Sequence, residues 1–297
     1  MVKKSLTPLF FLVYLGITLS SSAQVQLALE FNREKFIQHE AIDLTIQVIN
    51  NSGSQLTFGK NQGKIEFLII SEINRWSSKI DPFKNKKTDK RSFNAAAGLV
   101  LGAGETKRVT IRLNKYFPLA KAVKYRIKAR LSHPRLNKDL ETTNYSEIEV
   151  SAGNVIETKN FGVTDEKDPN KINNRKYTLL GFNVKNRDTY CLKIWDDKWV
   201  YALHRLGPRV HGIKPQNDVD AFSNIHILIQ LEPKVFMHTI YSPEGKKQQE
   251  VIYRASFDNV PRLRRDTDLG KISINNGLRA TEGVDYVKQG DSYKILK

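Results

Sequence analysis

The sequence predicts an all-β protein in which an N-terminal antiparallel β-sandwich is followed by a second β-rich domain. Short runs of alternating apolar and polar residues recur along the chain, with turn residues between them. In the first half, no long stretch has the 3.6-residue period of an amphipathic helix. The length of 297 residues suits two domains, each long enough to bury its own core.

The first 23 residues have the layout of a secretory signal peptide. Lys3 and Lys4 precede an apolar run over residues 6–19, and a stretch of small residues ends at Ala23. The apolar run is too short for a comfortable membrane span, and no later run approaches that length. We therefore expect cleavage after Ala23 and an exported chain, in the periplasm or outside the cell, without a transmembrane segment.

Residues 24–153 are expected to form the sandwich. The alternating runs lie at residues 26–31, 41–48, 65–70, 107–113, 124–131 and 145–150. In the clearest run, the apolar residues between Ile42 and Val48 share one face, and turn residues 50–53 end it. Six or seven short strands at this spacing are typical of an antiparallel sandwich.

The end of this half resembles the immunoglobulin-like modules of exported bacterial proteins. Residues 114–117, 124–127 and 146–150 look like the last three strands of such a module. The resemblance covers about residues 24–153, and the cysteine pair and buried tryptophan of antibody domains are missing. It implies an immunoglobulin-like sandwich. Such modules serve as spacers, adhesion modules, enzyme accessory domains or protease inhibitors, so the fold does not select a function.

The second half is expected to consist of a linker at residues 154–176, which are polar, and a β-rich domain at residues 177–297. Its strand-like runs lie at residues 177–184, 189–195, 199–204, 225–231, 235–242, 249–254 and 270–274. Residues 225–254, with a turn at 242–245, resemble one blade of a β-propeller. A blade takes about 40 residues, so this half is too short for a closed ring. We expect a sandwich rather than a partial propeller-like array of hairpins.

The formal net charge of +17 is spread over the whole chain. Lys3 and Lys4 supply only two of these charges. Such an excess suits an acidic glycan, a lipid headgroup or an acidic protein partner, and no specific nucleic acid is expected. A soluble surface that happens to be basic is the simpler interpretation.

The run at residues 124–131 places four cations on one side of a strand. With its apolar residues facing inward, the outer side carries Lys124, Arg126, Lys128 and Arg130. They would be roughly 6.6 Å apart and could bind a regularly spaced polyanion. Glu147 and Glu149 would face outward on the following strand. Antiparallel pairing would set them beside the cations, so we favour cross-strand ion pairs.

Two further segments are candidate binding sites. The polar segment 76–93 contains Lys84, Lys86 and Lys87, which either grip an anionic partner or lie in a solvated loop, as charge runs usually do. A three-residue turn after Trp195 would set that residue opposite Trp199. Exposed indoles would stack on sugar rings, whereas buried ones would form an ordinary aromatic pair, and burial is the default.

Signatures of catalysis are sparse. No histidines have the short spacing of a zinc site, and no nucleophile elbow or phosphate-binding loop is present. His204 and His211 flank a loop, with Asp218 and Asp220 beyond it, but their spacing does not require a metal or acid–base site. The single cysteine, Cys191, allows no intramolecular disulfide and is expected to be a buried structural thiol.

The sequence therefore predicts an exported, non-enzymatic binding or structural protein of the cell envelope or extracellular space, without a cofactor. An acidic glycan or other polyanion is the ligand class that the charge favours. One alternative is an immunoglobulin-like protease inhibitor acting through loops at one end of the first domain. Another is a hydrolase accessory protein or a metal-dependent enzyme with its site near His204 and His211.

Overall fold

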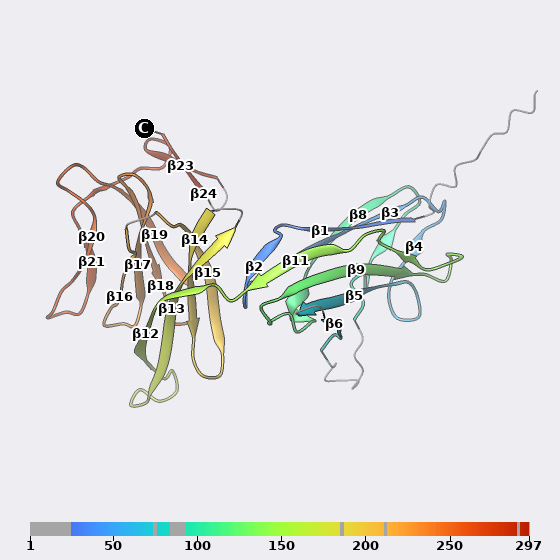
Figure 1. The fold of residues 1–297 in the computed structure, drawn as a ribbon, viewed down its shortest axis with the longest axis horizontal. Coiled ribbons are helices and arrows are strands. Elements are labelled where there is room, and N and C mark those ends of the chain that lie inside the picture. The colour runs from blue at the N-terminus through green and yellow to red at the C-terminus, as the bar shows by residue number, and fades with distance from the viewer. Residues whose placement is uncertain are drawn as a thin grey trace, which may run out of the picture.

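The computed structural model describes residues 25–73, 76–83, 93–184, 187–210, 213–289 and 292–296. Almost all of its regular structure is β-strand, and one short 3-10 turn, Leu113–Lys115, is the helical element among the described residues. The predicted all-β class is therefore confirmed. Two lobes follow one another along the long axis of the molecule (Figure 1). The predicted signal peptide, residues 1–23, lies outside the described residues.

The first lobe is a sandwich of two sheets. One sheet has the order β1 (Val25–Phe31), β3 (Asp43–Asn50), β8 (Thr106–Arg112). The other has the order β2 (Lys35–Ile37), β11 (Ser146–Ser151), β9 (Lys124–Ser132), β5 (Lys64–Ile73), β6 (Trp76–Ile80), with β10 (Leu140–Glu141) also beside β9. Two short strands, β4 (Leu56–Thr57) and β7 (Val100–Leu101), pair with each other. Pairing is antiparallel except between β2 and β11.

Alternation along the strands builds the core of this lobe. Ile42, Leu44, Ile46 and Val48 are buried on one side, as predicted. Tyr125, Ile127, Ala129 and Leu131 are buried on the facing sheet. Because successive side chains of a strand point to opposite faces, the four cations of β9 must lie on its outer face.

The second lobe is also sandwich-like. One sheet has the order β12 (Asn154–Thr164), β13 (Ile172–Val184), β14 (Arg187–Trp195), β15 (Val200–Pro208). The other has the order β16 (Gln216–Val219), β17 (Ile225–Glu232), β18 (Val235–Tyr241), β19 (Lys247–Arg254), β22 (Leu278–Arg279). Residues of both sheets, such as Tyr177 and Ile227, share one core.

Two hairpins complete the second lobe. The hairpin of β20 (Arg262–Arg265) and β21 (Ile272–Asn275) lies beside β16, on the side away from the first lobe (Figure 1). The hairpin of β23 (Tyr286–Gln289) and β24 (Ser292–Ile295) packs Tyr286 and Ile295 against the core. The turn predicted at residues 242–245 joins β18 to β19, where Gly245 has a φ of 86°.

Residues 154–176 are not a linker, and that prediction is wrong. They form β12 and the start of β13, paired in register from Asn154 to Thr164 apart from one bulge. This strand lies at the edge of its sheet, so backbone hydrogen bonds to one neighbour hold it and few of its side chains face the core. Phe161 and Val163 supply that contact. Val155 and Ile156 are exposed, and most of the other residues are polar, which hides the strand in the sequence.

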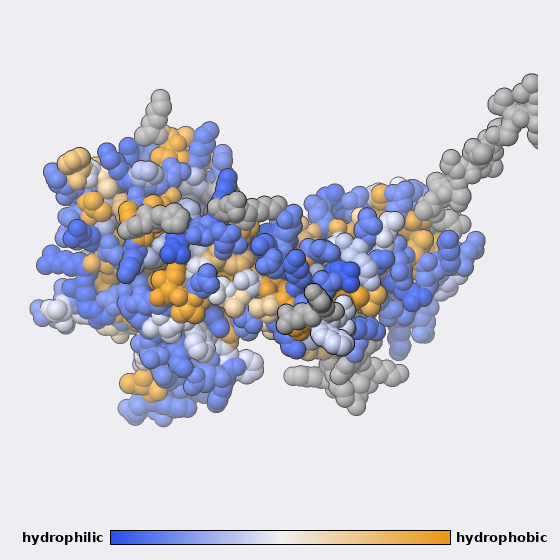
Figure 2. Space-filling model, viewed as in Figure 1, coloured by the Kyte–Doolittle hydropathy of each residue, from blue (hydrophilic) through white to orange (hydrophobic). Residues whose placement is uncertain are grey.

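The lobes meet at β2. Ile37 is buried in a small core with Leu180, Phe182 and Cys191 of the second lobe. Beside it, the guanidinium of Arg205 donates to both carboxylate oxygens of Glu40, at 2.7 and 2.8 Å. Figure 1 shows β2 and the end of β11 at this junction, and Figure 2 shows both hydrophobic and hydrophilic residues around it on the face in view.

Candidate functional site

The row of cations on β9 lies on the outer face, as predicted, with Arg126 opposite Glu147 and Lys124 opposite Glu149 in register. Arg126 forms its ion pair on the other side, where its Nε is 2.6 Å from a carboxylate oxygen of Glu72 on β5. Arg130 pairs with Asp139 at 2.6 Å. Both guanidinium groups of the row are therefore neutralised by neighbouring carboxylates.

The two lysines of the row differ from its arginines. Within the part of the chain that the structure describes, no carboxylate lies within 4 Å of the ammonium of Lys124 or Lys128. Lys128 instead lies 4.7 Å from the ring centroid of Tyr145. Arg108 and Arg112 are on β8 in the opposite sheet and do not extend the row. The row is thus no uniform basic stripe.

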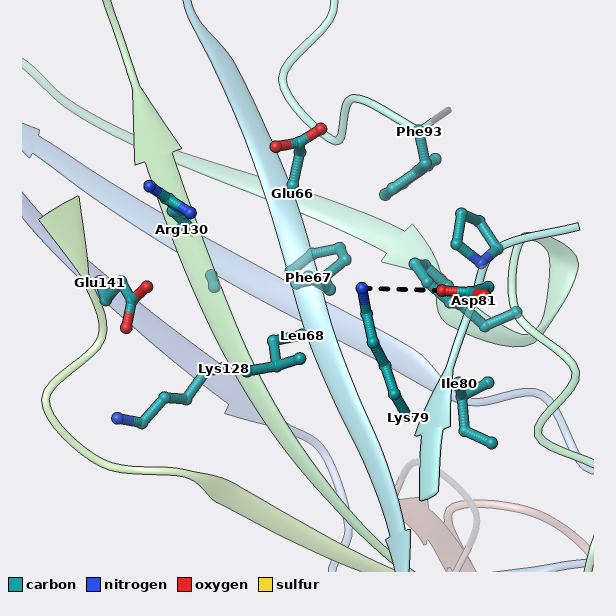
Figure 3. A pocket seen from close by; sticks show the side chains of 13 residues that line it. Glu66, Phe67, Leu68, Lys79, Ile80, Asp81, Phe93, Lys128, Arg130 and Glu141 are labelled. Atoms are coloured by element: carbon teal, nitrogen blue, oxygen red, sulfur yellow. Dashed lines mark ion pairs between the residues drawn. The ribbon is translucent and has the colours of Figure 1, made fainter. Parts of the chain in front are cut away.

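A pocket of about 290 Å³ lies at the edge of β5, next to Lys128 and Arg130 (Figure 3). We call it the edge pocket. β6 pairs with β5 only from Ile69 to Ile73, and among the described residues no strand pairs with the earlier part of β5 on this side. Phe67 and Phe93 form an apolar wall, with ring centroids 5.8 Å apart and ring planes inclined by 28°. The pocket therefore combines an aromatic wall with an uncovered strand edge.

The backbone of Phe67 points into this open edge. Two residues earlier, the N–H of Ile65 donates to the side chain of Asn94 and its C=O accepts the N–H of Ala95. Both groups of Ile65 therefore point away from β9. On β9, opposite Phe67, the N–H and C=O of Ala129 both bond to Thr142 and therefore point away from β5. By the two-residue alternation, the N–H and C=O of Phe67 share the direction of those of Ile65. No described residue bonds to them, so one donor and one acceptor are available there.

Charges of both signs form the rim of the edge pocket. The cations are Lys79, Lys128 and Arg130, and the carboxylates are Glu66, Asp81 and Glu141. Figure 3 shows Lys128, Arg130 and Glu141 on one side of β5, and the pair Lys79–Asp81, at 3.7 Å, on the other. Arg130 lies between Glu66 and Glu141 in register. The rim therefore carries cations and carboxylates in equal number around an apolar wall.

The tryptophans do not form the predicted pair. Trp195 is opposite Val200, not Trp199, because the turn has four residues. Asp196 fixes this turn by accepting the backbone N–H groups of Lys198 and Trp199 at 2.8 and 2.7 Å. The default of burial is also wrong for Trp199, which is 69% exposed. The other indole, that of Trp195, is half-buried and donates to Thr178 at 2.9 Å.

The residues considered for catalysis are not gathered into one site. Nε2 of His204 donates to the carbonyl oxygen of Gly245, 2.7 Å away, and the ring stacks on Tyr241. Asp218 binds Arg265 and Asp220 binds His226. Among the described residues, no group of three or more potential metal ligands is found. His211, Lys84, Lys86 and Lys87 lie outside the described residues.

A buried pair of histidines was not anticipated. Nδ1 of His226 lies 3.1 Å from Nε2 of His238 on the neighbouring strand, and Asp220 is 3.3 Å from the other side of His226. Burial, and secondarily the charge of His226, lowers the pKa of His238 to about 4. The two residues are not directly opposite in register, so only their diagonal placement on adjacent strands could have indicated the contact.

Comparisons with known proteins place the chain in no family. No protein-family model matches it, and neither does any curated protein. Among solved structures, the sporulation control protein Spo0M from Bacillus subtilis aligns with a TM-score of 0.28 and 10% identity, over 62% of this chain and 90% of that chain. A likeness of this size carries no argument about function. No helix in the described part of the chain is long and apolar enough to cross a membrane.

Proposed function

We propose that the protein is an exported, non-enzymatic binding protein that holds an acidic saccharide in the edge pocket. The observation that carries this proposal is the aromatic wall of Phe67 and Phe93 beside a rim of mixed charge. An apolar wall with a few convergent polar groups is the usual construction of a small-molecule site. Export is supported by the pattern of residues 1–23.

The balance of charges favours a saccharide over a long polyanion. The carboxylates of Glu66, Asp81 and Glu141 would repel a polyanion laid along β9. Toward a sugar they act as acceptors for hydroxyl groups. Lys128 or Lys79 would bind the acidic group of the sugar, and the free N–H and C=O of Phe67 add a donor and an acceptor.

The proposal is tested by titrating the protein with a short oligogalacturonate, using a neutral maltooligosaccharide of equal length as the reference ligand. Lys128→Gln removes a cation from the rim. Lys124→Gln removes one from the same row outside the pocket and serves as the matched control. We expect Lys128→Gln to weaken binding about tenfold or more, as for one charge-assisted hydrogen bond, and Lys124→Gln to leave it unchanged. The proposal would be contradicted if Lys128→Gln and Lys124→Gln weakened binding equally, or if the neutral maltooligosaccharide bound as tightly as the oligogalacturonate.

A further inference from the structure

A second pocket, of about 240 Å³, lies between the two lobes. We call it the interlobe pocket. Its charged lining consists of Arg33 and Glu40 from the first lobe and Arg205, Lys247, Glu250 and Lys288 from the second. None of these residues belongs to the edge pocket, so a ligand of the interlobe pocket is independent of the proposed saccharide site.

One wall is built around Glu40, whose side chain is only 9% exposed. Its Oε1 accepts from Nη1 of Arg33 at 2.9 Å and from Nε of Arg205 at 2.7 Å. Its Oε2 accepts from the second arm of Arg205 and from the backbone N–H of Ile37, at 2.8 and 2.9 Å. A single carboxylate is thus shared by two guanidinium groups.

The opposite wall repeats this arrangement around Glu250. Lys247 and Lys288 lie 2.6 and 2.7 Å from its carboxylate oxygens, and the hydroxyl of Tyr293 also donates to it. Burial alone would raise the pKa of Glu250, but the hydrogen bonds from Lys247, Lys288 and Tyr293 outweigh it and lower that pKa to about 2. Glu250 is therefore ionised at neutral pH, and again one carboxylate serves two cations.

The remaining titratable groups of the lining do not cancel this imbalance. His204 also lines the pocket, and burial lowers its pKa, so it is neutral at pH 7. Among the described residues of the lining, Lys247 and Lys288 share the single carboxylate of Glu250, so this wall carries more cations than carboxylates. A concave site with one sign of charge concentrates counter-ions, and arginine and lysine together are suited to phosphate oxygens.

We infer that the interlobe pocket binds a small dianionic oxyanion group, as inorganic phosphate or as a phosphate monoester. The ligand would lie between the walls of Glu40 and Glu250 and would complete the charge balance of the Glu250 wall. Since the walls come from different lobes, binding also fastens the lobes together.

The test is calorimetric titration of the protein with inorganic phosphate, against chloride at equal ionic strength. A parallel titration with glycerol phosphate shows whether the pocket prefers a phosphate monoester to free phosphate. Lys247→Gln and Lys288→Gln each remove one cation but leave Glu250 with a partner. Arg262→Gln, at an exposed position on β20, removes an equal charge far from the first lobe and is the control.

We expect saturable phosphate binding that either lysine variant weakens about tenfold, and that Arg262→Gln and Lys128→Gln do not change. Thermal melting without phosphate establishes that each variant is folded. Because Lys247→Gln and Lys288→Gln each remove one cation from the same carboxylate, the two variants should weaken phosphate binding to a similar extent. Phosphate binding no stronger than that of chloride would overturn the inference. So would undiminished binding in both lysine variants.

Discussion

The outer face of the first lobe and the interlobe pocket use the same charged residue types in opposite ways. On the outer face the ion pairs of β9 join one carboxylate to one cation, and both partners stay partly exposed, as for Arg126 and Glu72 at 33% and 37%. In the interlobe pocket Glu40 and Glu250, at 9% and 18% exposed, each hold two cations. The number of cations in a region therefore says little about its affinity for anions. Local balance and burial decide it.

The comparison predicts its largest effect at Glu40. Glu40→Ala leaves Arg205 without its buried counter-charge and should lower the free energy of unfolding by about 3–5 kcal/mol. Urea denaturation measures this change. Asp43→Ala, which breaks the exposed pair with Arg112, is the control and should cost less than about 1 kcal/mol. Equal losses of unfolding free energy in Glu40→Ala and Asp43→Ala would contradict the distinction between the interlobe pocket and the outer face.

A smaller effect, with a definite pH dependence, is expected at Glu250. Its pKa is lowered from 4.5 to about 2 in the folded protein. The native state therefore binds fewer protons than the unfolded state between these values, and stability falls as pH falls through this window. Glu250→Gln should cost about 3 kcal/mol at pH 7, with a cost that shrinks below pH 4.5. Denaturation curves at pH 7, 5, 4 and 3 give the difference, and a cost independent of pH would contradict the assignment.

Cys191 reports on the same junction. It is fully buried against Ile37, and burial raises the pKa of its thiol to about 12. A disulfide reagent should react with it only during opening of the junction. In Glu40→Ala the reaction should be at least about tenfold faster, a change equivalent to about 1.4 kcal/mol. An unchanged rate would mean that Glu40 does not hold the lobes together.

The smallest effect is expected on the outer face. A double-mutant cycle with Arg126→Gln and Glu72→Gln should give a coupling energy of about 0.2–1 kcal/mol, reduced further by salt. A coupling of several kcal/mol would mean that the row contributes to stability as strongly as the junction does.

Local rules predicted much of the first lobe from the sequence. Two-residue alternation identified the buried side of β3 and β9, and it set Glu147 and Glu149 beside the row of cations, although the ion pair of Arg126 is with Glu72. The same rules missed β12, because an edge strand with few inward side chains lacks an apolar pattern. They also misplaced Trp199, because Asp196 stabilises a turn one residue longer than expected.

The sites depend on contacts that no local pattern contains. The ion pair of Arg126 with Glu72 requires knowing that β5 is the second neighbour of β9. The edge pocket arises where β6 ends, and the interlobe pocket joins residues as far apart as Arg33 and Lys288. Such sites depend on which strands become neighbours and on how the two lobes pack together. Neither can be inferred from a local sequence pattern.

The central claim, that an acidic saccharide binds at the open edge of β5, is tested most directly at one backbone amide. Amide chemical shifts of the ¹⁵N-labelled protein are followed while a short oligogalacturonate is added. The amide of Phe67 should shift strongly, together with those near Lys79 and Lys128. The amide of Lys124, which lies in the same row but outside the pocket, should change little. Shifts spread evenly along the row from Lys124 to Arg130, with none at Phe67, would contradict the account.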